Sequence, residues 1–100
     1  MRRKIAKRRR RDILRKGGII RREGWLYDHY PDGYKEKIGY EAHVEYYGWV
    51  IFAGGRDELD AYKIAIRSMP WCEENQKDEN NGYLQISEDK KAAIKGIWAL

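Results

Sequence analysis

Residues 38 to 46 alternate between two kinds of side chain, and this pattern limits the fold more than any other part of the chain. Apolar or aromatic residues alternate with polar or small ones in the order Ile38, Gly39, Tyr40, Glu41, Ala42, His43, Val44, Glu45 and Tyr46. Successive side chains of a β-strand point to opposite faces, so this period of two predicts a strand with one buried face and one polar face. Such a strand needs neighbouring strands and a layer that covers its apolar face.

Two further segments are predicted to pair with this strand. Residues 19–30 are rich in Ile, Trp and Tyr, which favour strands, and the Pro31-Asp32-Gly33 sequence after them is typical of a turn. Residues 49–53 form a short apolar run, which predicts a central strand. Tyr47-Gly48 either makes a tight connection into this run or, if the two segments form one long bent strand, supplies a glycine bulge.

Helical patterns flank the predicted strands. Residues 2–16 contain no proline or glycine, and Gly17-Gly18 after them is a typical C-terminal cap. A second helix is predicted to begin at Asp57, whose side chain can cap it. Its apolar residues recur at helical spacing, namely Leu59, Tyr62, Ile66 and Met69. Pro70 is expected to end this helix.

The C-terminal third of the chain contains weaker patterns. Residues 71–82 are mostly polar and are expected to form a surface loop, and residues 83–86 are expected to form a short edge strand. Ser87, Glu88 and Asp89 are typical of a helix N-terminus, and apolar residues follow them to the end of the chain. A final helix is therefore predicted over residues 88–99.

These segments predict one α+β domain in a chain of 100 residues. The expected architecture is a small two- or three-stranded antiparallel sheet with helices packed on one face, preceded by a basic N-terminal helix. Residues 1–18 are predicted to form this arginine-rich arm, and residues 19–100 are predicted to form the domain.

Charge is distributed very unevenly along the chain. Residues 1–22 contain twelve Lys and Arg residues and one acid, a net charge of +11, whereas residues 23–100 contain nine basic and fifteen acidic residues, a net charge of −6. Together these values give the overall charge of +5. A strongly cationic segment on an acidic body indicates either a polyanionic partner or an intramolecular charge clamp.

The basic segment predicts binding to RNA, to DNA or to a nucleoprotein complex, because clustered cations release counterions from phosphates and arginine adds bidentate hydrogen bonds. The predicted contact residues are Arg2, Arg3, Lys4, Lys7, Arg8, Arg9, Arg10, Arg11, Arg15, Lys16, Arg21 and Arg22. Three simpler interpretations stay open: a solvated tail, a localisation signal, and attraction to an anionic membrane.

Aromatic residues make up 13% of the chain. Tyrosine and tryptophan both stack on bases and anchor protein interfaces, but a domain with one Phe must also use them to fill its core. Five aromatic residues are predicted to lie in the core, namely Tyr40, Tyr46, Phe52, Tyr62 and Trp98. Three tyrosines at predicted turns are the candidates for an exposed contact surface, namely Tyr30, Tyr34 and Tyr47.

Catalytic and cofactor motifs are missing from the sequence. Cys72 has no histidine near it, and His29 and His43 lie among carboxylates at a spacing that fits no recognised metal site. We therefore predict a protein that is not an enzyme, with no catalytic residues, no metal and no cofactor. The sequence also contains no apolar run of about 20 residues and no signal-peptide core, so a cytoplasmic protein without a transmembrane segment is expected.

The order of elements resembles that of the double-stranded-RNA-binding domain. That family has a lysine-rich start to its last helix, whereas the matching stretch here, Gly55 to Arg67, has Arg56 followed by acids, so membership is not predicted. In size and style the chain is similar to small accessory proteins of phages and mobile elements, including inhibitors of host nuclease systems. This resemblance implies an alternative function, in which an anti-CRISPR-like inhibitor or adaptor binds a host nucleic-acid enzyme through its acidic, aromatic body.

Overall fold

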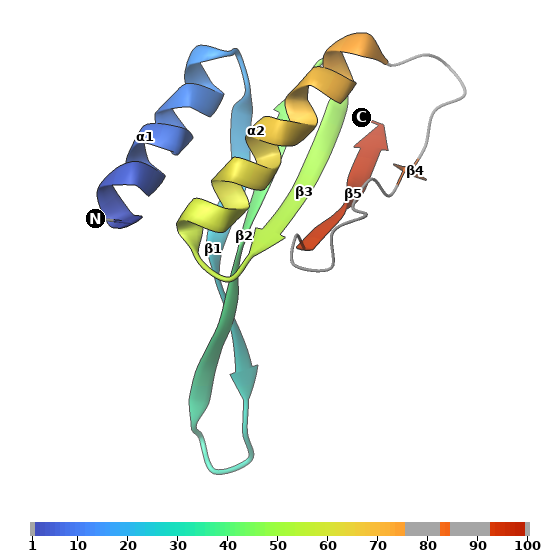
Figure 1. Cartoon of the computed structure of the whole chain (residues 1–100). Coiled ribbons are helices and arrows are strands. Elements are labelled where there is room, and N and C mark those ends of the chain that lie inside the picture. The colour runs from blue at the N-terminus through green and yellow to red at the C-terminus, as the bar shows by residue number, and fades with distance from the viewer. Residues whose placement is uncertain (1, 76–82, 85–92, 100) are drawn as a thin grey trace.

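The structure is a computed structural model that describes residues 2–75, 83–84 and 93–99 (Figure 1). Its elements are α1 (Arg2–Arg15), β1 (Ile19–His29), β2 (Lys35–Tyr46), β3 (Trp49–Gly55), α2 (Glu58–Glu74), β4 (Tyr83–Leu84) and β5 (Ala93–Ala99). The strands form an antiparallel sheet in the order β1-β2-β3-β5-β4, and the two helices lie side by side on one face of it. The predicted α+β architecture with a basic N-terminal helix is thus confirmed, and the described sheet has five strands where two or three were predicted.

The alternation in β2 positions the core between the sheet and the helices. Tyr40, Ala42, Val44 and Tyr46 are buried, whereas the residues between them are half-buried on the opposite face. Ile38 differs from the prediction, because its side chain is 53% exposed. It lies where β1 and β2 continue past the body as a two-stranded ribbon, so no helix covers it (Figure 1).

Two predicted turns are confirmed. The chain reverses at Pro31-Asp32-Gly33, where the Gly33 N–H donates to the Tyr30 carbonyl over 3.0 Å and the Tyr34 N–H donates to the Asp32 carboxylate over 3.0 Å. Tyr47 and Gly48 connect β2 to β3 directly, since Tyr46 pairs with Trp49. The tight connection is therefore correct, and the single bent strand is not.

α1 ends in a Schellman motif, which is the cap that its two glycines predict. The Gly18 N–H donates to the Ile13 carbonyl over 2.9 Å, and the Gly17 N–H donates to the Leu14 carbonyl over 3.1 Å. Gly17 has a φ of 99°, a left-handed conformation that glycine adopts without steric cost. This cap turns the chain from the helix directly into β1.

α2 begins as predicted but continues past Pro70. The Asp57 carboxylate caps the helix by accepting the Asp60 N–H over 3.0 Å. The helix then runs to Glu74, so the prediction that it ends at Pro70 and is followed by a loop from residue 71 is wrong. The additional turn buries Cys72 and packs the Trp71 ring 5.0 Å from the Trp49 ring. This burial offsets the hydrogen bond that proline cannot make.

The C-terminal segment forms strand β5 where a helix was predicted. Ala93–Ala99 pairs with β3, and Tyr83–Leu84 pairs with β5 as the short edge strand that was predicted. β3 is a buried strand, and β2 pairs with only one of its edges. The backbone groups on its other edge also need hydrogen-bond partners, and residues 93–99 supply them as a strand. The predicted helix start at residues 87–89 and most of the predicted loop lie outside the described residues.

Candidate nucleic-acid interface

α1 has one face against the body and one face open to solvent. Ala6 and Ile13 are buried in the core formed with α2 and the sheet, and Arg9 and Arg10 are half-buried beside them. Residues seven apart on a helix lie on the same side, so Ala6 and Ile13 define its inner face. The predicted arm is consequently a helix that contributes side chains to the hydrophobic core.

The outer face of α1 is a row of basic side chains, which we call the cationic stripe. Its members are exposed, and each lies three or four residues from at least one other member: Lys4, Lys7, Arg8, Arg11 and Arg15. From the first to the last they span about 16 Å of the helix axis. None of the five has an ion-pair partner within residues 2–75. Like charges at this spacing repel one another, so the stripe favours an external anion.

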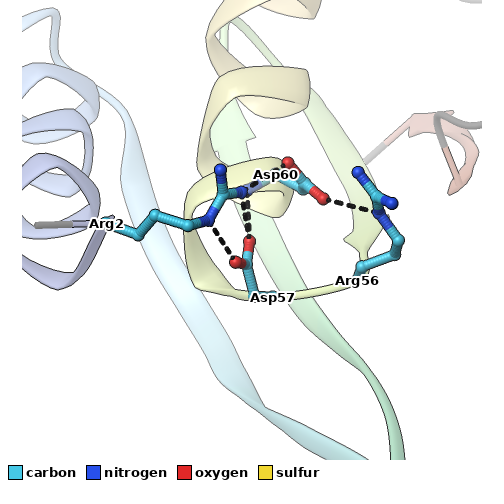
Figure 2. Close-up of polar contacts among 4 residues, drawn as sticks. All are labelled: Arg2, Arg56, Asp57 and Asp60. Carbon is cyan, nitrogen blue, oxygen red and sulfur yellow. Dashed lines mark hydrogen bonds and ion pairs between the residues drawn. The ribbon is translucent and has the colours of Figure 1, made fainter.

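Arg2 fastens the first turn of α1 to the first turn of α2. Its Nε lies 2.8 Å from Asp57 Oδ2, and its Nη2 lies 3.1 Å from Asp60 Oδ1. Figure 2 shows these contacts together with the 3.3 Å pair between Arg56 and Asp60. The hydrogen bond from Arg2 lowers the pKa of Asp57, although partial burial opposes this effect. The same carboxylate therefore caps α2 and holds α1.

Arg10 starts a hydrogen-bonded chain that joins four elements. Its Nη2 lies 2.8 Å from Glu23 Oε1 on β1. Glu23 also accepts a hydrogen bond from the Tyr62 hydroxyl on α2, which lies 3.0 Å from the Tyr40 hydroxyl on β2. Tyr40 and Tyr62 are buried, as predicted, and this chain satisfies their polar ends.

The charge of Glu23 is stabilised by this chain. Burial alone would raise the pKa of Glu23, but hydrogen bonds from Arg10 and Tyr62, together with the positive charge of Arg10, outweigh burial and lower it. Burial, with the bonds to Glu23 and Tyr40, raises the pKa of Tyr62, which stays protonated and donates.

The remaining basic residues that were predicted to contact nucleic acid fall into two groups, those with an ion pair and those without one among the described residues. Arg9 lies 3.4 Å from Asp12, and Arg21 on β1 lies 3.1 Å from Glu45 on β2. Arg3, Lys16 and Arg22 are exposed and have no ion pair within residues 2–75. One face of α1 therefore makes the intramolecular clamp, and the other exposes cations that have no ion pair among the residues described up to position 75.

The three candidate contact tyrosines are exposed but lie at two ends of the molecule. Tyr30 and Tyr34 flank the tip of the β1–β2 ribbon, with ring centroids 5.5 Å apart, and Tyr47 lies at the opposite end of β2. Their side chains are 42%, 58% and 50% exposed, respectively. The sequence prediction missed Tyr27 and Ile38, which are also exposed on the ribbon. Both residues lie in the part of the hairpin that neither α1 nor α2 covers (Figure 1). The available signal was the length of the hairpin, which is greater than a helix layer of this size can cover.

The histidines and the cysteine lie apart from one another. His29 pairs with Lys35 in the ribbon, whereas His43 lies on the body of the sheet, with its Nε2 3.1 Å from Glu41. The His43 ring stacks on Phe52, which is half-buried, so the prediction that Phe52 lies in the core is wrong. The side chain of Trp98, which was also predicted to lie in the core, is outside the described part of the chain. Across the described ranges, no group of three or more His, Cys, Asp and Glu side chains could hold a metal ion. Cys72 is fully buried, and burial raises the pKa of its thiol to about 12.

The described helices include none with the length and apolar character that a membrane span requires. Comparisons of the chain with protein-family models, with curated proteins and with solved structures find no match.

Proposed function

We propose that this protein is a non-enzymatic binder of RNA or DNA, free or in a nucleoprotein complex, and that the cationic stripe contacts the phosphates. The observation that supports this function is the stripe itself, which is five exposed cations without ion pairs to any residue in the range 2–75, on a helix whose opposite face is fixed to the body. A solvated tail would not place two of its residues in the core. Phosphate groups are anions that arginine binds bidentately, so a polyphosphate backbone suits this surface.

Binding of this kind depends strongly on salt and weakly on sequence. Phosphate contacts release condensed counterions but carry no base information. If all five stripe residues contact phosphates, log K should fall against log salt with a slope of about −4.5 on duplex DNA and about −3.5 on single strands. A salt-titrated binding assay with duplex DNA, single strands and structured RNA measures this slope.

A matched pair of double variants tests which surface carries the binding. Lys7→Ala with Arg11→Ala removes one lysine and one arginine, four residues apart, from the stripe. Lys63→Ala with Arg67→Ala removes the same residue types at the same spacing from exposed positions on α2. The first variant should reduce the duplex slope by about 1.8, and the second should leave it unchanged. Equal effects of the two variants, or no binding by the wild type, would contradict the proposal.

The ribbon supports a second candidate function, the inhibitor or adaptor that binds a nucleic-acid enzyme. Tyr27, Tyr30, Tyr34 and Ile38 are exposed on it, and exposed tyrosines are common at protein interfaces. Its three acids and two lysines over residues 27–38 give no cationic surface for phosphates. Inhibition of a CRISPR nuclease that survives the Lys7/Arg11 variant, but is lost with Tyr30→Ser and Tyr34→Ser, would favour this candidate.

A further inference from the structure

Tyr47 has a backbone conformation that suits a different residue. Its φ is 50°, followed by 82° at Gly48, so both residues of the turn between β2 and β3 are left-handed. Turns of this kind favour Asn-Gly, and a bulky aromatic side chain is unusual at their first position. The Tyr47 side chain is also half exposed and therefore adds little to the core. Strained residues of this kind are concentrated at functional sites.

The neighbour of Tyr47 holds its ring in place. The Tyr46 and Tyr47 rings form a T-shaped pair, with an angle of 89° between their planes and centroids 4.7 Å apart. Tyr46 is itself buried, and its hydroxyl donates to Glu73 Oε1 over 2.6 Å. Tyr47 is thus supported on one side by a fixed ring and is open to solvent elsewhere, so little conformational entropy is lost when a planar group stacks on it.

Tyr47 lies at the same end of the molecule as the C-terminus of α1. Ile19 pairs with Glu45, which places the end of β2 beside the start of β1. A Cβ atom at Gly17, just after α1, would lie 3.9 Å from the Tyr46 ring. Figure 1 shows the end of α1 and the β2–β3 connection at the end of the sheet opposite the ribbon. The last residue of the stripe, Arg15, and the exposed Lys16 are therefore in this region.

We propose that Tyr47 is a stacking platform for an unpaired nucleobase, and that the preferred ligand carries unpaired nucleotides beside the phosphates bound by the stripe. This inference rests on the proposed nucleic-acid binding. Single strands are bound by exposed aromatic rings combined with cations, because every base has a face that can stack and every nucleotide has a phosphate. Tyr47 and the last cations of the stripe, at the same end of the molecule, offer this combination. A blunt duplex offers the phosphates but keeps its bases paired.

The substitution Tyr47→Asn tests this role without damaging the turn. Asparagine favours the left-handed conformation, so the melting temperature should stay the same or rise. The ligands are a blunt DNA duplex and the same duplex with a single-stranded extension that carries 2-aminopurine, whose fluorescence falls on stacking. The variant should bind the extended duplex roughly 5- to 150-fold more weakly and abolish the quenching, with blunt-duplex affinity unchanged. Tyr47→Phe, which keeps the ring, should behave like the wild type.

Tyr34→Asn is the control, since it removes an exposed tyrosine at the far end of the molecule. Wild-type affinity and quenching in Tyr47→Asn would overturn the inference, as would an equal loss on blunt and extended duplexes. A failure of the proposed stripe alone would give a different result. The Lys7/Arg11 variant would then bind like the wild type, while Tyr47→Asn would still weaken binding of the extended duplex. No wild-type binding to either duplex would overturn both proposals.

Discussion

Glu23 connects α1 to the body through charged hydrogen bonds. It accepts hydrogen bonds from Arg10 on α1 and Tyr62 on α2, and through Tyr62 it is connected to Tyr40 on β2. Its side chain is 25% exposed, so these charged hydrogen bonds are only partly screened by water. A carboxylate at this position lets a helix rich in arginine lie against the body without an unpaired inner charge.

Replacement of Glu23 by glutamine should destabilise the fold. The amide keeps the shape but removes the charge that Arg10 and Tyr62 contact, so we expect a loss of about 1.5–3 kcal/mol in the free energy of unfolding. Urea denaturation measures this loss. Glu45→Gln is the matched control, because Glu45 also lies on the sheet and pairs with one arginine, the exposed Arg21. Its loss should stay below about 1 kcal/mol, and equal losses would argue against a special role for Glu23.

The hydrogen bonds of Glu23 predict that the stability of the fold depends on pH. The pKa of Glu23 is lowered in the folded state, so its contribution is fully present above its unfolded pKa of about 4 and is lost as pH falls through the folded value. The difference in unfolding free energy between the wild type and Glu23→Gln should therefore be constant near neutral pH. It should narrow as pH falls from about 5 towards 2. A difference that stays constant over that range would show that the carboxylate charge is not the stabilising feature.

At the scale of elements, the sequence of α1 mixes residues that pack in the core with residues that face solvent. Ile13 is fully buried, whereas the next residue, Leu14, is 44% exposed. Ile13→Ala should cost about 2–5 kcal/mol of unfolding free energy, as for other large-to-small changes in a core. Leu14→Ala should change it by less than about 0.5 kcal/mol. Thermal or urea unfolding of the two variants compares them, and a small effect of Ile13→Ala would mean that α1 is dispensable for the fold.

Sequence patterns predicted the elements whose structure depends on residues that are close together in the sequence. The alternation in β2, the Asp57 cap, the Gly17 cap and both turns follow from neighbours along the chain. The structure of β5 does not follow from its neighbours along the chain. It is a strand because it pairs with the edge of β3, more than 35 residues earlier in the sequence. The extension of α2 past Pro70 likewise depends on the contact of Trp71 with Trp49.

The candidate site was predictable in composition but not in orientation. The sequence shows twelve basic residues in the first 22, yet their division between clamp and stripe depends on where Glu23, Asp57 and Asp60 lie in the fold. The seven-residue spacing of Ala6 and Ile13 was the available signal. It indicates an inner face that also carries Arg2, Arg9 and Arg10.

On the scale of the whole molecule, two different surfaces point in different directions. The stripe lies on the helical layer, and the aromatic ribbon extends past the opposite end of the sheet from Tyr47 (Figure 1). Because the tip contributes nothing to the buried core, Tyr30→Ser with Tyr34→Ser should change the unfolding free energy by less than about 0.5 kcal/mol. Affinity for nucleic acid should also stay unchanged in a shift assay. Weaker binding by this variant would place the ribbon within the nucleic-acid interface.

The anchoring of α1 also determines the heat signature of any binding event. A free arginine-rich peptide must order its backbone on its ligand, and such coupled folding gives a large negative change in heat capacity. Here Ile13 in the core and the contacts of Arg2 and Arg10 already fix the helix before a ligand arrives. Titration calorimetry with a blunt duplex at several temperatures would then record a heat-capacity change close to zero, with ion release as the main driving force. In the proposed binding, α1 would contact its ligand as a helix that is already folded and packed on the body.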